Sequence, residues 1–245
     1  MMKSYWKRKG FIISAEVPII TVTVEGANTG SVVTAFYCAD AGLSSYHIRN
    51  FNSMGGRSFV VTQSVKKLSH VLKQAVFNDC DYRLLSDDSS VSIEALKTFD
   101  RKDEKNRSVY NDKAYKIIEA NTLLDVGLYK EKILNNGKTK KVKSKATLKQ
   151  HVIITFSRKS MEYQRFIRNR QIERAKKILE KMDPSEYKKG PNDVTRFIKK
   201  TECSNDKYEL DLEKIREEEK YDGFYAIATN LDDCVKDILA INEQR

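Results

Sequence analysis

The amino-acid sequence predicts an α/β protein, because β-prone apolar runs alternate with segments of helical spacing. Residues 11–24 and 31–39 are rich in Val, Ile, Thr and Phe and are predicted as buried strands, with "EGANTG" as the turn between them. The segment 43–54 follows with Leu, Tyr, Ile and Phe at roughly helical spacing. "RSFVVTQ" (57–63) and "SVKKLSHVLKQAVF" (64–77) then repeat the order of strand and helix. This alternation is typical of a sheet covered by helices.

The middle of the sequence predicts a β-rich segment followed by a long helix. Residues 79–109 are polar and are expected to be rich in loops, apart from a short helix around "VSIEALK". Residues 113–156 favour strands, and "NNG" at 135–137 is a strong hairpin-turn sequence. The segment 158–182 has helical periodicity and ends at Asp183-Pro184. Its apolar residues keep mostly to one side and are predicted to be core: Met161, Phe166, Ile167, Ala175, Ile178, Leu179 and Met182.

The end of the sequence returns to the pattern of its beginning. "YDGFYAIATN" (221–230) is predicted as a strand, and "LDDCVKDILAINEQR" as a helix. Three prolines and ten glycines in 245 residues argue against a disordered chain.

Charge points to a polyanionic partner. The chain has 45 Lys and Arg against 34 Asp and Glu, a net charge of +11. Residues 130–181 carry +13, whereas the remaining residues sum to −2. One continuous segment therefore makes the protein basic, and polyanions are its natural partner class.

Other composition features exclude several classes. The four cysteines are far apart, with no C-x-x-C and no His at ligand spacing, so a zinc site is not expected. The N-terminal apolar run is interrupted by Glu16 and Pro18 and has no small-residue cleavage site, unlike a signal peptide. No apolar stretch approaches 18 residues, so no membrane span is expected and the protein is predicted to be cytoplasmic.

Asp40 is the acidic residue that the sequence places most distinctively, at the tip of the apolar run "SVVTAFYCA". An Asp here can cap the next helix, or it can serve a site, since sites gather at the C-terminal edge of strands. A haloacid-type phosphoryl enzyme would need a second Asp where Gly42 stands. The Rossmann sequence G-x-G-x-x-G and the hydrolase sequence G-x-S-x-G are absent, and the three histidines lie in different elements.

Three segments together resemble one family. They are "CADAGLSSYHIRNFNSMGGRSFVVTQSVKKL", "TFSRKSMEYQRFIRNRQIERAKKIL" and "EEKYDGFYAIATNLDDCVKDILAINEQR", in that order. The sequence closely resembles the DDE transposases of bacterial insertion sequences, in the branch with a long β-rich insertion, over roughly residues 32–245. The resemblance implies a ribonuclease-H-like core in which two Asp and one Glu hold two Mg²⁺ ions against a scissile phosphate.

The resemblance implies specific site residues and also reveals departures. Asp40 corresponds to the family's second catalytic Asp and metal ligand, and Arg245 to an Arg four residues before the catalytic Glu. Many relatives have Tyr where Asn242 stands. Residues 1–39 contain no Asp, only Glu16 and Glu25, and the sequence ends at Arg245. One of the three catalytic carboxylates is therefore expected in this chain, and Mg²⁺ is the cofactor of the intact family.

The expected architecture is an incomplete ribonuclease-H-like core interrupted by a β-rich insertion with one long helix. Residues 1–78 are expected to form the N-terminal part of the core, 79–220 the basic insertion domain, and 221–245 the return strand and a truncated core helix. In the family, such an insertion helps to hold the DNA ends. "KTKKVKSK" suits a phosphate-binding surface, although a hairpin that is merely solvated by its charge is the alternative. The candidate DNA contacts are Lys138, Lys140, Lys141, Lys143, Lys145, Arg165, Arg168 and Arg170, the three arginines being expected to be exposed.

Three functional hypotheses follow. The first is a transposase-derived polypeptide that binds double-stranded DNA such as transposon ends, associates with the nucleoid when bound, and is inactive in cleavage by itself. The second is a non-catalytic, sequence-tolerant DNA-binding module. The third is a pseudogene product without function. The resemblance also allows a homodimer, as in transposition complexes.

Overall fold

The structure of the chain, a computed structural model, forms two compact units. It describes residues 11–14, 19–24, 33–133, 137–181, 193–201 and 208–243. The first unit is formed by the described residues of Met1–Ser90, Tyr115–Ile154 and Tyr225–Arg245, and the second by those of Val91–Ala114 and Thr155–Phe224. In the described part of the chain, each helix is too short or too polar to span a lipid bilayer.

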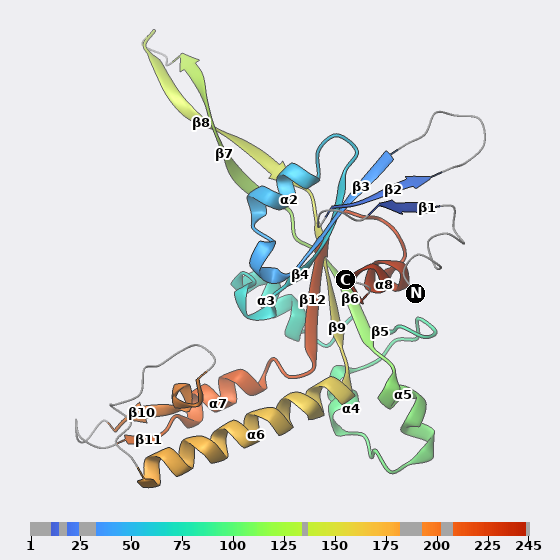
Figure 1. Cartoon of the computed structure of the whole chain (residues 1–245), viewed down its shortest axis with the longest axis vertical. Coiled ribbons are helices and arrows are strands. Elements are labelled where there is room, and N and C mark those ends of the chain that lie inside the picture. The colour runs from blue at the N-terminus through green and yellow to red at the C-terminus, as the bar shows by residue number, and fades with distance from the viewer. Residues whose placement is uncertain are drawn as a thin grey trace. The chain divides into compact units, whose positions relative to one another are not determined.

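An eight-stranded mixed sheet organises the fold (Figure 1). In spatial order its strands are β1 (Phe11–Ser14), β2 (Ile19–Val24), β3 (Val33–Ala39), β4 (Ser58–Gln63), β12 (Phe224–Thr229), β9 (His151–Phe156), β6 (Ala114–Glu119) and β5 (Arg83–Leu84). β3 and β4 are parallel, whereas β2 pairs antiparallel with β3, and β12 with β4. The predicted α/β class is confirmed.

Most of the predicted strands are confirmed, with one difference at the start. The segment 11–24 contains β1 and β2, which pair antiparallel with Phe11 opposite Val24, so it is a strand pair rather than one strand. The segment 113–156 is β-structure as expected, and β12 lies in the same sheet as β3. "EGANTG" lies outside the described residues.

The core of the first unit lies between the sheet and helix α8 (Val235–Glu243). Val60, Ile153 and Ile227 from three neighbouring strands are fully buried and belong to one cluster with Ile238 and Leu239 of α8. Burying each such side chain contributes about 1.5–3 kcal/mol. These contacts hold α8 against the strands whose ends carry Asp40 and Gln63.

Two short helices complete the first unit. α2 (Tyr46–Asn52) is capped by Ser45, and α3 (His70–Phe77) by Ser69, each hydroxyl accepting a backbone N–H. The 3-10 turns η1 (Ala41–Leu43) and η2 (Val65–Lys67) follow β3 and β4 directly. Both ends of the parallel pair therefore lead into turns on the same edge of the sheet.

A buried lysine fixes the end of α3. Lys116 of β6 donates to the carbonyl oxygens of Ala75, Asn78 and Cys80, at 3.1, 3.3 and 2.8 Å. A cation at a helix C-terminus satisfies carbonyl groups that have no partner within the helix. Lys116 is thus a structural residue rather than part of a basic surface.

A separate hairpin extends from the first unit (Figure 1). It consists of β7 (Thr122–Ile133) and β8 (Thr139–Leu148), which pair antiparallel with a bulge between Asp125 and Tyr129. α2 packs against both strands. The expected turn at 135–137 lies mostly outside the described residues, but Gly137 has a φ of +74°, the conformation that such turns favour.

The second unit is mainly helical. Its helices are α4 (Ile93–Thr98), α5 (Arg107–Asn111), α6 (Arg158–Lys181) and α7 (Leu212–Glu219), with the 3-10 turns η3 (Glu104–Asn106) and η5 (Val194–Phe197) and the strand pair β10 (Ile198–Lys200) and β11 (Tyr208–Leu210). Ala175 of α6 packs with Phe197, Ile198 and Ile215. The predicted long helix is confirmed over Arg158–Lys181, and the expected core residue Met182 lies outside the described residues. Phe166 was expected in the core, but it is 57% exposed.

The expected division into 1–78, 79–220 and 221–245 differs from the observed units. β5, β6 and β9 come from the expected insertion, yet they are strands of the eight-stranded sheet. The second unit also begins at Val91 and resumes at Thr155. Three strands of residues 79–220 thus belong to the main sheet, whereas the strand pairs β7–β8 and β10–β11 of the same segment lie outside it.

Candidate functional site

The C-terminal edge of β3 and β4 carries Asp40, the acidic residue that the sequence singled out. Because the strands are parallel, Asp40 after β3 and Gln63 at the end of β4 lie at the same edge. The last described turn of α8 lies there too, since Cys38 Sγ is 4.0 Å from the carbonyl oxygen of Ile241. Thr62 Oγ1 donates to Asn242 Oδ1 at 3.5 Å. Ligand sites in open α/β sheets commonly occupy such an edge.

Asp40 is exposed and directly follows β3. Its carbonyl oxygen accepts from Leu43 N at 2.9 Å, but its carboxylate does not cap η1. Helix capping, the structural alternative for this residue, is therefore not what its side chain does here. Arg245, the other expected site residue, lies outside the described residues.

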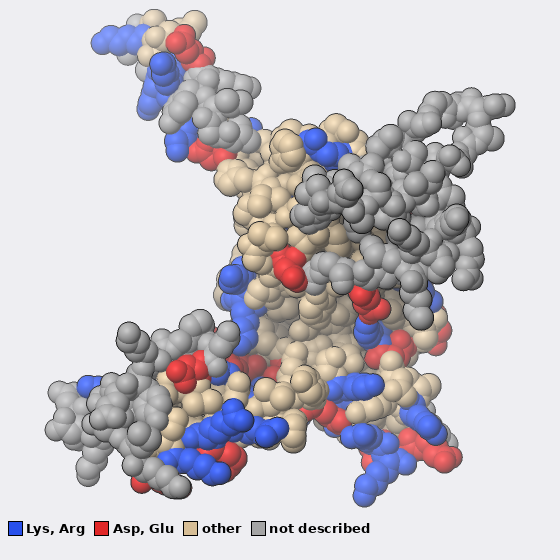
Figure 2. All heavy atoms as spheres, in the orientation of Figure 1, with Lys and Arg blue, Asp and Glu red and all other residues tan. Residues whose placement is uncertain are grey.

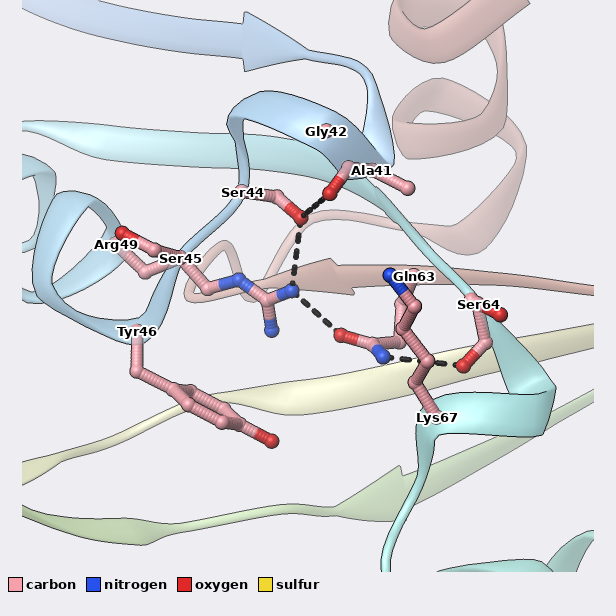
Figure 3. A pocket seen from close by; sticks show the side chains of 9 residues that line it. All are labelled: Ala41, Gly42, Ser44, Ser45, Tyr46, Arg49, Gln63, Ser64 and Lys67. Atoms are coloured by element: carbon pink, nitrogen blue, oxygen red, sulfur yellow. Dashed lines mark hydrogen bonds between the residues drawn. The ribbon is translucent and has the colours of Figure 1, made fainter. Parts of the chain in front are cut away.

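A pocket of about 360 Å³ lies at this edge, where η1 follows Asp40 in the chain (Figure 3). Its lining residues come from η1, α2, the end of β4 and η2: Ala41, Gly42, Ser44, Ser45, Tyr46, Arg49, Gln63, Ser64 and Lys67. Two of them, Arg49 and Lys67, are cations, and none is acidic. The pocket is positively charged and rich in hydroxyl groups.

Arg49 is the central side chain of the pocket (Figure 3). It is only 3% exposed, and its guanidinium lies 5.2 Å from the centre of the Tyr46 ring. Nη2 donates to Ser44 Oγ at 3.2 Å and to Gln63 Oε1, and Nη1 donates to Gln150 Oε1 at 3.2 Å. Nε is buried and has no hydrogen-bond partner among the described residues. All three acceptors are neutral.

This environment makes Arg49 an uncompensated buried charge. Burial lowers the pKa of Arg49 below its ordinary value, and Tyr46 offsets this in part. An arginine stays protonated in proteins, so the charge remains. A buried cation with only neutral partners attracts an anion strongly, because the low dielectric weakens screening.

The described residues at this edge do not fit the Mg²⁺ pair that the family resemblance implies. Mg²⁺ prefers carboxylate oxygens and water. The pocket at this edge instead presents Arg49 and Lys67, and no group of three or more His, Cys, Asp or Glu among the described residues could hold a metal ion.

The lysines of the hairpin are exposed along β8 and face different neighbours (Figure 2). On one face of the hairpin, Lys132 lies directly opposite Lys140. On the other face, Lys141 lies opposite Glu131, and Lys143 Nζ forms an ion pair with Asp125 at 3.0 Å. Like charges directly opposite each other are destabilising in an antiparallel pair, so Lys132 and Lys140 repel each other.

Of the three arginines of α6 that were expected to be exposed, Arg165 and Arg170 are exposed and Arg168 is not. Arg168 is 5% exposed and forms ion pairs with Asp222 at 2.6 Å and Glu219 at 3.5 Å, so its predicted exposure is wrong. Arg165 is partly exposed and lies 3.6 Å from Asp222. Arg170 is exposed, with its guanidinium 5.7 Å from the centre of the Phe166 ring. Arg165 and Arg170 thus remain as surface cations, and Arg168 does not.

The sequence reasoning missed Arg49, because its acceptor Gln150 is 101 residues away along the chain. Around α2, Leu43, Tyr46 and Phe51 are exposed, whereas Arg49, Asn50 and Asn52 are buried. The sequence feature that could have indicated this pocket is the presence of several polar residues in the helical segment that follows Asp40.

Comparison with known proteins gives no relative for this site. No protein-family model, curated protein or solved structure matches the chain.

Proposed function

We propose that the chain is a sequence-tolerant DNA-binding protein of transposase ancestry, which binds duplex DNA through the hairpin of β7 and β8. The observation that carries this proposal is the Lys132–Lys140 pair, two exposed cations held opposite each other. Such repulsion costs stability in the free protein and is relieved when a polyanion lies across the ribbon.

The charge and shape of the hairpin support the same partner. Residues 122–148 contain seven lysines against Asp125 and Glu131. A two-stranded β-ribbon fits the major groove of B-form DNA, and lysines at its surface can reach phosphates. Contacts with phosphates position a protein on DNA but do not read its sequence, so sequence-tolerant binding is expected.

Transposase ancestry is proposed on the motifs around Asp40 and β12, and two features support it. Asp40 follows one strand of a parallel pair, and the end of α8 lies at the same edge. The resemblance implies that the family's Asp and Glu converge on such an edge. Because the residues described there do not fit Mg²⁺, DNA binding rather than strand cleavage is the activity that we assign to this chain.

Salt-dependent binding tests the proposal. If about six cations contact phosphates, log K should fall against log salt with a slope of about −5. Replacing Lys138, Lys140, Lys141 and Lys143 together with Gln should flatten the slope by about three units, at about 0.9 per phosphate contact, with Lys143 counting least because Asp125 already pairs with it. Binding to unrelated duplexes should weaken about equally. The measurement is a fluorescence titration at several salt concentrations.

A matched control separates the hairpin from net charge. Lys66, Lys102, Lys220 and Lys236 are exposed and lie outside both the hairpin and α6. Replacing these four with Gln changes the net charge equally and should leave the slope nearly unchanged. Equal effects of the two quadruple variants would contradict a hairpin site, and the pair Arg165 and Arg170 would then be the next surface to replace.

A further inference from the structure

We infer that the pocket around Arg49 is a binding site for a single phosphate group. It is distinct from the hairpin surface, because its donors gather around one buried arginine rather than along an exposed row of lysines. It is also not a cation site, since its lining contains Arg49 and Lys67 and no carboxylate.

The hydrogen-bonding capacity of Arg49 carries the first step. A guanidinium has five N–H donors. Gln150, Ser44 and Gln63 accept three of them, and Nε has no acceptor among the described residues. Arg49 is only 3% exposed, so its buried side chain retains two unused N–H donors and a full positive charge. An anion bound in the pocket that Arg49 lines would supply an acceptor and the opposite charge.

The partners of Arg49 hold it in place for such a ligand. Ser44 Oγ donates to the carbonyl of Ala41 at 3.0 Å, and Gln63 Nε2 to that of Ser64 at 3.1 Å (Figure 3). Gln150 donates to Ala120 O at 3.0 Å, so its amide is oriented as well. A guanidinium fixed by three oriented acceptors is preorganised, which lowers the cost of binding.

The remaining lining residues indicate phosphate rather than a larger or apolar anion. The pocket that Arg49 lines also has three residues with hydroxyl groups, Ser45, Tyr46 and Ser64, and the exposed Lys67. A volume of about 360 Å³ is at the low end of small-molecule pockets. Arginine is the preferred residue for phosphate because its planar fork matches two oxygens, and a lysine adds a mobile charge.

Two ligands carry such a phosphate group, the free phosphate ion and the end of a nucleic acid. The position of the pocket favours the end of a nucleic acid. Gln150, which binds Arg49, also lies at the base of the hairpin, where its backbone N–H donates to Asn121 Oδ1 at 3.2 Å. Inorganic phosphate is the first probe, because its binding does not depend on whether the hairpin binds DNA. A short single strand with a 5′-phosphate, compared with the same strand without it, is the second.

Calorimetric titration of the full chain with inorganic phosphate, against chloride at equal ionic strength, tests the site. Lys67→Gln changes an exposed lining residue and should raise Kd about three- to tenfold. Arg49→Lys keeps the charge but loses the planar fork, and should raise Kd at least about tenfold. Circular dichroism establishes that this variant is folded.

The control is Lys66→Gln, the exposed neighbour of Lys67 that does not line the pocket, and it should bind phosphate as the wild type does. The quadruple hairpin variant should also keep phosphate binding, so failure of the hairpin proposal and failure of this one are distinguishable. Stronger binding of the 5′-phosphorylated strand than of its unphosphorylated form, lost in Lys67→Gln, would identify a nucleic-acid end as the ligand. Binding of inorganic phosphate alone would identify the free ion.

Two results would overturn the inference. One is wild-type protein that binds phosphate no better than chloride. The other is phosphate affinity that is unchanged in both Lys67→Gln and folded Arg49→Lys.

Discussion

Gly223 stands immediately before β12 in a conformation that suits glycine. Its φ is +82°, and an added Cβ would lie 2.7 Å from Phe156 Cε2 and 2.9 Å from Met161 Cβ. Its N–H donates to Gln164 Oε1 at 2.7 Å, and its carbonyl accepts from Ser157 N at 3.0 Å. The start of α6 thus closes around a residue without a side chain.

Gly223→Ala should therefore destabilise the second unit. The left-handed conformation costs an L-residue about 1–2 kcal/mol, and overpacking costs about 1–3 kcal/mol more. Urea unfolding followed by circular dichroism should show a loss of about 2–5 kcal/mol, the sum of the two effects. Gly42→Ala is the control, because its Cβ would meet no atom within 4 Å, and it should change stability little. A Gly223→Ala protein as stable as Gly42→Ala would contradict the packing described.

Single residues show what sequence reasoning can and cannot determine. Asp40 was placed at a strand end correctly, because the apolar run and the following glycine define that end locally. Arg168 was assigned to the surface, but its partner Asp222 is 54 residues away, and no local pattern reveals a distant carboxylate. Arg49 was missed for the same reason, since its acceptor Gln150 is 101 residues away.

At the scale of elements, the hairpin provides a prediction that links stability to binding. Lys132→Glu places an opposite charge across from Lys140, which should stabilise the ribbon by about 0.2–1 kcal/mol. The same change should weaken DNA binding and flatten the salt slope by about one unit, because a phosphate contact is lost. Hydrogen exchange of the β7 and β8 amides and DNA titration measure the two effects.

Lys132→Gln is the matched control for that experiment. It removes the repulsion without adding attraction, so it should give a smaller gain in exchange protection than Lys132→Glu does. Faster amide exchange in Lys132→Glu, or tighter DNA binding, would contradict the role assigned to the Lys132–Lys140 pair.

Helices and strands were predicted well where hydrophobic periodicity alone defines them, and less well where they depend on pairing between strands. The strands of 113–156 and the long helix α6 follow from local patterns, and both are present. The segment 11–24 instead forms two paired strands. β12 pairs with β4, so that Ala226 lies opposite Gln63, which is more than half of the chain away in sequence. No local sequence pattern specifies this pairing.

At the scale of the whole molecule, we expect no Mg²⁺-dependent cleavage or strand transfer by this chain. Among the described residues no group of three or more His, Cys, Asp or Glu could hold a metal ion, and the pocket at the edge that carries Asp40 adds two cations, which repel divalent ions. Incubation of the protein with labelled duplex and Mg²⁺ should yield no product, and Asp40→Asn should bind DNA as tightly as the wild type. Cleavage that requires Mg²⁺ and disappears in Asp40→Asn would contradict this expectation.

The position of β12 also has a consequence for how the protein folds. β4 pairs with β3 on one side and β12 on the other, and β12 in turn joins β9 and the strands beyond it. During synthesis, the buried strand Phe59-Val60-Val61 has its second edge unpaired until residue 229 has been made. Long-range pairing of this kind slows folding and leaves an open apolar edge prone to association. Shortened chains that end before β12 should accordingly aggregate, because the strand that closes the centre of the sheet is made after all its other described strands.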